Sequence, residues 1–234
     1  MVKENVFRFK QFNIRQSDRV HKVGTDGVLL GAWVNLTSED SQILDGGTGT
    51  GLIALLLAQR SDALITGLEP DPIAFNLASE NVALSPFANR VILKPSRLQD
   101  YSSSEKYDVV VINPPFFENR LRSPLDHRNV QRHNDVLPFH ELLPAAKGLL
   151  KNSGRLALIL PVEEGQQFIQ EALNHKLYTK RITEVKSKPN RPIFRLLMEF
   201  HGEESAPQIE ALVLEDERGN RSAAYQSLTE AFYL

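Results

Sequence analysis

Four consecutive residues, Asn113-Pro114-Pro115-Phe116, have the chemistry to act on a planar amino group. The Asn113 side-chain oxygen and the Pro114 carbonyl can each accept one hydrogen from an –NH2 group that is conjugated to a ring. Accepting both hydrogens would free the nitrogen lone pair to attack a methyl group. The two prolines stiffen the segment and remove competing backbone donors, and Phe116 offers a face on which a base can stack. The tetrapeptide therefore predicts a catalytic site made of these four residues.

A glycine-rich turn, from Asp45 to Gly51, follows an earlier apolar run and predicts a cofactor site. Gly47, Gly49 and Gly51 let the backbone approach a ligand closely, and the helix expected after them offers free N–H groups. Glu69 ends the next apolar run, where a carboxylate can hold ribose hydroxyls. Asp45 can pair with the cationic part of S-adenosylmethionine but would repel a pyrophosphate. The pattern therefore favours S-adenosylmethionine as the cofactor.

A nicotinamide dehydrogenase is the alternative that the glycine turn alone leaves open. Residues 49–54 also fit the pattern G-x-G-x-x-A, and Glu69 follows at the distance expected for a ribose ligand. The tetrapeptide has no role in hydride transfer, however. We therefore favour methyl transfer and expect Asn113 to line the cofactor site as well as the acceptor site.

The composition indicates a single domain, 1–234, with a sizeable core, since 41% of the residues are hydrophobic. There is no cysteine, and the 6 histidines lack metal-binding spacing, so we expect no metal. The first residues lack a hydrophobic signal region, and no apolar run approaches the roughly 18 residues of a membrane span. We expect a soluble cytoplasmic protein, with no sign of an obligate protein partner.

The net charge of −2 conceals two basic segments, one after the tetrapeptide and one between Lys176 and Arg195. Basic segments in a nearly neutral chain are typical of contact with a phosphate backbone, and ordinary solvated surface is the alternative. The residues that we expect to contact RNA are Arg120, Arg122, Arg128, Lys188, Arg191 and Arg195.

The apolar segments alternate in a way that predicts an α/β fold, with a mainly parallel sheet covered by helices on both faces. The expected strands are 42–45, 64–69, 91–93, 107–112, 155–160, 177–186, 193–200 and 209–214. The expected helices are 51–60, 71–84, 138–150, 163–175, one through 28–34 that Thr25 or Asp26 would cap, and a short one in the tail. Residues 6–15 predict a half-buried hairpin, and 113–136 a long functional or mobile loop.

Further motifs extend along nearly the whole chain. They are Phe9–Phe12, Lys22–Trp33, the glycine turn, the tetrapeptide with Phe117, Pro189–Arg191 and Phe232–Leu234. In these motifs the chain resembles the class I S-adenosylmethionine-dependent methyltransferases and, more narrowly, the bacterial tRNA(Val) adenine-N6 methyltransferases. The resemblance implies N6-methylation of the adenine 3′-adjacent to the anticodon of tRNA(Val).

The resemblance also implies a Rossmann-like fold with a seven-stranded mixed sheet and a small N-terminal hairpin and helix extension. Residues 1–40 would close the cofactor pocket, 41–200 would form the core, and 201–234 the last strand and tail. Thr25 and Asp26 would help to bind the cofactor, with a plain helix cap as the alternative reading. Arg97 departs from the family pattern, because it stands where an aspartate usually contacts the cofactor adenine. Asp100 or a backbone oxygen would have to replace that aspartate.

Other acceptors remain open. Related tetrapeptides occur in enzymes that methylate guanine N2 in ribosomal RNA or the glutamine amide of release factors. The glutamine enzymes typically have tyrosine in place of Phe116 and an additional helical domain, for which about forty residues before the first core strand are too few. A remote alternative is an RNA-binding module that keeps the fold without catalysis.

Overall fold

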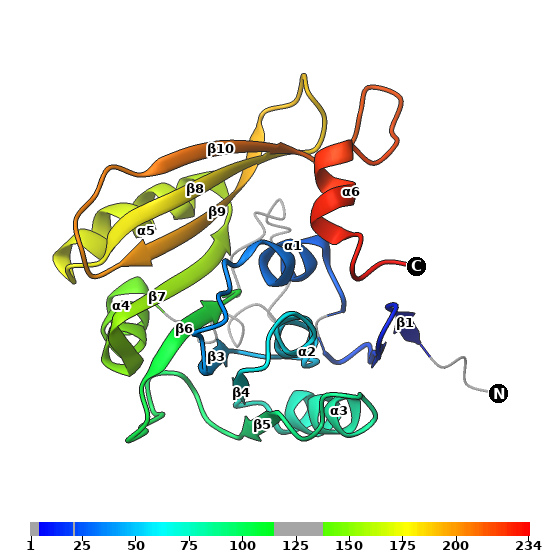
Figure 1. Cartoon of the computed structure of the whole chain (residues 1–234), viewed down its shortest axis with the longest axis vertical. Helices are drawn as coiled ribbons and strands as arrows, with labels where there is room; N and C mark the ends of the chain where they lie inside the picture. The colour runs from blue at the N-terminus through cyan, green and yellow to red at the C-terminus, as the bar shows by residue number, and fades with distance from the viewer. Residues whose placement is uncertain (1–4, 21, 115–137) are drawn as a thin grey trace, which may run out of the picture.

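The computed structural model describes residues 5–20, 22–114 and 138–234 (Figure 1). In this part of the chain, eight strands form one sheet. They are β3 (Gln42–Gly46), β4 (Leu64–Leu68), β5 (Val91–Lys94), β6 (Tyr107–Ile112), β7 (Leu150–Leu160), β8 (Tyr178–Lys186), β9 (Ile193–His201) and β10 (Gln208–Val213). Their order is β10-β8-β9-β7-β6-β3-β4-β5. Neighbouring strands are parallel except at β9, which is antiparallel to both β7 and β8.

The sheet has one strand more than the seven that the resemblance implied. The expected strand at 209–214 forms as β10 and pairs with the outer edge of β8. Its apolar pattern predicted a strand but could not tell whether that strand would join the sheet, because the pairing depends on an edge that only the folded chain presents. Strand β7 begins at Leu150, five positions before the expected start, and its pairing with β6 contains a register shift after Tyr107.

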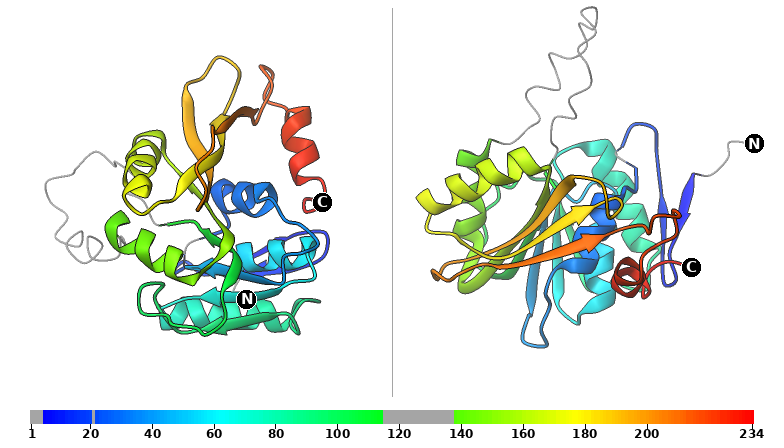
Figure 2. Two further views of the ribbon diagram at one scale, coloured as in Figure 1. Left: turned by 60° about the vertical axis from the view of Figure 1, so that its left-hand side comes forward. Right: turned by 90° about the horizontal axis from the view of Figure 1, so that it is seen from above.

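Helices cover both faces of the sheet, as predicted (Figures 1 and 2). One face carries α1 (Thr25–Trp33), α2 (Leu52–Arg60), α3 (Pro72–Ala83) and α6 (Ala223–Thr229), and the other carries α4 (Phe139–Leu149) and α5 (Val162–Asn174). Successive β6 residues point into opposite cores: Val109 and Val111 into the first, Val110 and Ile112 into the second. Burial on both faces explains why this strand is a continuous apolar run.

The expected N-terminal hairpin is formed by β1 (Val6–Arg8) and β2 (Asn13–Arg15). It meets the C-terminal tail, because the backbone N–H of Lys10 donates to the carbonyl of Phe232 at 2.8 Å. The ring of Phe9 stacks on Tyr233 with centroids 6.0 Å apart. The hairpin and the C-terminal tail therefore pack together beside the first core.

The predicted cap of α1 is wrong. The N-cap residue is Gly24, which has an extended backbone and no side chain to donate or accept a bond. Thr25 and Asp26 are instead the first two residues of the helix. Glycine is an acceptable N-cap residue. Because the cap is Gly24, the side chains of Thr25 and Asp26 are available for other contacts.

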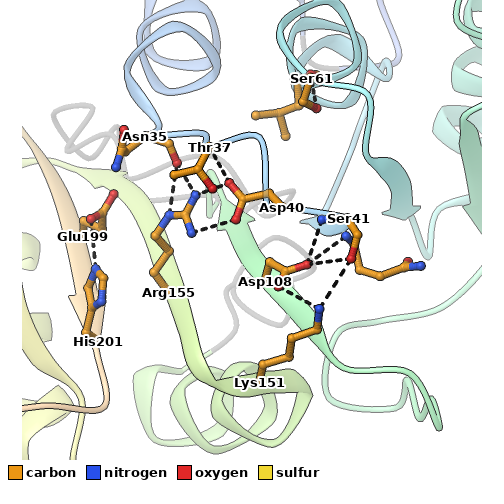
Figure 3. A network of polar contacts seen from close by, with 12 residues as sticks. Asn35, Thr37, Asp40, Ser41, Ser61, Asp108, Lys151, Arg155, Glu199 and His201 are labelled. Carbon is orange, nitrogen blue, oxygen red and sulfur yellow. Dashed lines mark hydrogen bonds and ion pairs between the residues drawn. The ribbon is translucent and has the colours of Figure 1, made fainter.

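Two ion pairs lie at the amino ends of the strands, at the opposite edge of the sheet from the predicted site (Figure 3). Arg155 of β7 forms a two-pronged pair with Asp40 and also donates to the backbone carbonyl of Asn35, with Nε–O 3.0 Å. Lys151 Nζ lies 2.7 Å from Asp108 Oδ1. Because Asn35 and Asp40 belong to the connection between α1 and β3, the Arg155 pair fixes that connection to the sheet.

Candidate functional site

The carboxyl ends of three neighbouring strands bring the predicted site residues together. Gly46, the last residue of β3, pairs with Ile112 at the end of β6 and with Leu68 at the end of β4. The glycine turn therefore leaves the sheet between Asn113, which follows β6, and Glu69, which follows β4. Ligands of open α/β sheets bind at this edge.

The glycine turn has a backbone that other residues would adopt only with strain. Gly47, Gly49 and Gly51 have φ values of 82°, 57° and 83°. A Cβ atom built on Gly47 or Gly49 would have no atom of the described residues within 4 Å, so none of these residues fills the space beside the turn. Gly51 is also the N-cap of α2. The turn therefore presents a bare backbone to a volume that a ligand could fill.

Asp45 is fully buried at the end of β3 and has one carboxylate oxygen to spare. Its Oδ2 accepts hydrogen bonds from Thr48 Oγ1 at 2.6 Å and from the backbone N–H of Ala54 in α2 at 3.1 Å. Its Oδ1 is buried and has no hydrogen-bond partner among the described residues. Burial raises the pKa of Asp45 to about 7. A cationic ligand group beside Oδ1 would stabilise the ionised form.

Glu69 is buried and braces the glycine turn. Its Oε2 accepts from the backbone N–H of Gly49 at 2.8 Å, and its Oε1 accepts from that of Asp71 at 2.9 Å. Burial raises the pKa of this carboxyl group. Each oxygen can accept a further bond, so these contacts are compatible with the predicted grip on ribose hydroxyls.

Asn113 also has an unused buried acceptor. Its Oδ1 is buried and lacks a hydrogen-bond partner in the part of the chain that the structure describes. A Cβ built on Gly27 would lie 4.0 Å from Asn113 Nδ2, so the first turn of α1 faces this amide across a space that a small side chain would fill. Pro114 is buried beside it. Pro115 and Phe116 lie outside the described residues, so their catalytic roles stay predictions.

The predicted RNA-contacting residues are only partly described. Arg120, Arg122 and Arg128 lie outside the described residues. Lys188 and Arg191 belong to the connection 187–192 between β8 and β9, where Lys188 Nζ lies 3.8 Å from Glu215 Oε2.

Arg195, in β9, forms an ion pair with Asp26 in the first turn of α1, with Nε–Oδ2 2.9 Å. The structure thus joins two residues to which the sequence assigned different partners, RNA and the cofactor. Thr25, next to Asp26, is in the same turn. Arg97 and Asp100 are both exposed after β5, and the choice between them as contacts of the cofactor adenine stays a prediction.

An unpaired carboxylate oxygen, an open glycine turn and an acidic residue at the next strand end fit S-adenosylmethionine, which has a cationic amino acid portion and a ribose. The model of the methyltransferase small-domain family matches residues 24–188. The tRNA1(Val) (adenine(37)-N6)-methyltransferase of Parabacteroides distasonis is 42% identical over 231 residues, 97% of each chain. The enzyme of the same name from Christiangramia forsetii is 40% identical over 233 residues, again 97% of each. The chain belongs to the tRNA1(Val) (adenine(37)-N6)-methyltransferase family.

The comparison with solved structures shows the fold. A predicted O-methyltransferase from Agrobacterium tumefaciens superposes with a TM-score of 0.71, covering 88% of this chain and 96% of that one, at 18% sequence identity. The predicted class I methyltransferase fold is confirmed, with β10 as an addition. The cofactor of this methyltransferase is S-adenosylmethionine. Among the described residues, no group of three or more histidines or acids could hold a metal ion, and no helix is long and apolar enough to cross a bilayer.

Two residues of the methyltransferase site escaped the sequence reasoning. Thr48 donates to Asp45, and Asn81, a buried residue of α3, donates its amide to the carbonyl of Thr50 at 2.9 Å. The Asn81 amide also bonds Arg15 of β2 in both directions, so it ties the hairpin to the turn. Asn81 follows the buried Ala74 and Ala78 at helical spacing, so it is a polar residue on an apolar helical face. That pattern could have predicted a structural role for Asn81 from the sequence.

Binding of S-adenosylmethionine is expected to strengthen as pH rises from 6 to 8. The free protein holds Asp45 partly protonated because burial raises its pKa to about 7, whereas the cationic ligand favours the ionised form. At a pH one unit below its pKa, a carboxyl group is about one-tenth ionised. The affinity for S-adenosylmethionine should therefore be roughly tenfold weaker at pH 6 than at pH 8. Calorimetry in buffers of different ionisation enthalpy would also detect the proton released on binding.

The matched variants for this measurement are Asp45→Asn and Glu69→Gln. Asp45→Asn should bind weakly and remove the pH dependence, whereas Glu69→Gln should weaken binding and retain it. The raised pKa of Asp45 also makes the stability of the ligand-free protein depend on pH. Because the folded pKa lies above the unfolded value, the stability that Asp45 contributes is present at acidic pH and is lost as pH rises through about 7. Affinity that does not change between pH 6 and 8 would contradict this role of Asp45.

Proposed function

We propose that this methyltransferase transfers a methyl group from S-adenosylmethionine to the N6 amino group of an adenine in tRNA. We further propose that the adenine is position 37, 3′-adjacent to the anticodon of tRNA(Val). Relatives with that activity in their names are 40–42% identical along nearly the whole chain, which supports both statements. The reaction would take place in the cytoplasm, where tRNA is found.

The observation that carries the proposal is the unused acceptor of Asn113. A buried amide oxygen without a partner among the described residues costs stability unless a ligand donates to it. Asn113 follows β6 and lies beside the glycine turn. A group that donates to its side-chain oxygen would therefore lie next to the cofactor. An exocyclic amino group has two hydrogens, one for Asn113 Oδ1 and one for the carbonyl of Pro114.

The residues that would hold the cofactor are Asp45, Gly47, Gly49, Gly51 and Glu69. S-adenosylmethionine supplies an electrophilic methyl group when bound. Asn113 and Pro114 would orient the adenine amino group and make its lone pair available, so that catalysis rests on positioning and polarisation. No strong base is required, because an alkylated amino nitrogen is acidic and can release its proton to solvent.

The remaining predicted residues would complete the acceptor site and its cover. Phe116 would stack on an adenine flipped out of the RNA, and Pro115 would keep the segment stiff. Residues 1–40 would close the cofactor pocket, with Thr25 and Asp26 at its rim. The position of Gly27, which faces the Asn113 amide, supports a cover in this place.

The connection between β8 and β9 is suited to grip tRNA. Strand β9 is antiparallel to both β7 and β8, so β8 runs in the same direction as β7 and β6. The carboxyl end of β8 therefore lies at the same edge of the sheet as Asn113. Lys188 and Arg191 therefore project from the catalytic edge. They would contact phosphates together with Arg120, Arg122 and Arg128.

Replacing Lys188 and Arg191 together by alanine is expected to weaken tRNA binding. Each lost phosphate contact should lower the slope of log affinity against log salt by about 1, and the affinity should fall roughly tenfold at low salt. Filter binding at several salt concentrations would measure both quantities. Lys106→Ala, at the amino edge of the sheet, is the matched control and should change neither. Unchanged affinity in the double variant would assign these residues to ordinary surface.

Methyl transfer from labelled S-adenosylmethionine to tRNA without the modification would test the function. The tRNA would be digested to nucleosides and the labelled nucleoside identified by mass. N6-methyladenosine at position 37 of tRNA(Val) is the expected product. Label in N2-methylguanosine of ribosomal RNA, or in a protein glutamine, would replace the proposed acceptor. Failure to bind S-adenosylmethionine would indicate a non-catalytic RNA-binding module.

A further inference from the structure

The ion pair between Asp26 and Arg195 lies at the edge of the proposed site, and methyl transfer as proposed does not use it. Arg195 Nε is 2.9 Å from Asp26 Oδ2, and the two side chains are only 18% and 20% exposed. The guanidinium also donates through Nη1 to the carbonyl of Phe194 at 2.9 Å and lies 5.3 Å from the centroid of that ring. These contacts hold the planar fork of Arg195 in one orientation, which a lysine could not reproduce.

The pair fixes a helix end that lacks a side-chain cap. Gly24 offers no capping oxygen to the first turn of α1, and the acidic residue in that turn is Asp26. The next residue, Gly27, lies close to Leu52 at the start of α2 and faces the Asn113 amide: a Cβ on Gly27 would lie 3.0 Å from Leu52 Cδ2 and 4.0 Å from Asn113 Nδ2. A shift of the turn that carries Asp26 would therefore change the space beside the Asn113 side chain.

The other end of α1 is held independently. Trp33 Nε1 donates to Thr183 Oγ1 at 2.8 Å, and Arg181 both stacks over the Trp33 ring at 3.8 Å and donates to its carbonyl. Loss of the Asp26–Arg195 pair would thus loosen the first turn while the last turn stays attached to β8. The added motion would be confined to the first turn of α1 and would affect the Asn113 side chain.

We propose that Asp26 and Arg195 are positioning residues, whose ion pair holds the first turn of α1 beside Asn113 and so limits the movement of the amide that receives the acceptor amino group. The inference rests on the proposed role of Asn113. It replaces the prediction that Arg195 is a phosphate contact and assigns the Asp26 carboxylate to Arg195 rather than to the cofactor.

A steady-state comparison of Asp26→Asn, Arg195→Gln and the double variant separates these roles. If the two residues act as a pair, each single variant should lower kcat about tenfold, and the double variant should be no slower than either. The KM for tRNA should be unchanged or lower in Asp26→Asn, because a negative charge is lost near the RNA. If Arg195 only contacts phosphate, Asp26→Asn keeps its kcat, Arg195→Gln raises KM, and the proposal is overturned.

Hydrogen exchange of the peptide spanning residues 24–30 provides a readout that does not depend on activity. Faster exchange in Asp26→Asn, with unchanged exchange around Trp33, is expected, and equal exchange in both proteins would refute the positioning role. Lys151→Met is the matched control, since it breaks a partly buried pair with Asp108 at the opposite edge of the sheet and should leave kcat unaltered. A wild-type protein that methylates no tRNA would refute the proposed function, and the exchange result would still decide the fate of this pair.

Discussion

Asn113→Ala is expected to lower kcat for methyl transfer by about 10²–10³, the usual effect of removing one polarising group from a catalytic site. The variant would lose the Oδ1 atom that has no partner among the described residues and would leave one amino hydrogen of the acceptor unpaired. Affinity for S-adenosylmethionine should change by less than roughly threefold, because Asp45, Glu69 and the glycine turn would hold the cofactor without it. Single-turnover kinetics and calorimetry would measure the two effects.

The control for this variant is Asn152→Ala, which removes the same side chain from an exposed position of β7 at the opposite edge of the sheet. It should retain wild-type kcat. A loss of cofactor affinity in Asn113→Ala as large as the loss of kcat would contradict the proposed role, since Asn113 would then act mainly in binding. Pro114 remains in the variant, so any residual rate would report the contribution of the backbone acceptor.

Asp40→Ala is expected to lower the free energy of unfolding by about 3–5 kcal/mol. Arg155 is 7% exposed and Asp40 is 9% exposed, so removing the carboxylate leaves a buried guanidinium without its counter-ion. The carbonyl of Asn35 would remain as a partner but carries no full charge. Urea denaturation followed by circular dichroism would measure the change.

Glu80→Ala is the matched control, because it breaks an ion pair with Arg15 whose side chains are 59% and 46% exposed. Exposed pairs contribute about 0–1 kcal/mol, so this variant should remain close to wild type. A double variant, Asp40→Leu with Arg155→Met, should recover much of the loss, since two apolar side chains can replace a buried pair. Equal destabilisation by Asp40→Ala and Glu80→Ala would show that burial of the Arg155 pair has no special effect.

The amino-acid sequence was enough to predict the order of strands and helices in the core and the residues at the strand ends. Continuous apolar runs such as 107–112 mark strands covered on both faces, and the residues after them must lie at one edge of a parallel sheet. The proximity of Asp45, Glu69 and Asn113 was therefore predictable, because local periodicity and strand direction are properties of short segments.

Contacts between segments far apart in the chain could be found only in the folded structure. It joined Asp26 to Arg195, across 169 positions, and attached Asn81 to the glycine turn. It also added β10 to the sheet and made Gly24 the cap of α1. A charged side chain near the surface can pair with a ligand, with RNA or with another element, and the composition of its own segment does not distinguish them. The partner of such a side chain depends on which groups lie within a few ångströms of it, and packing of the whole chain determines that.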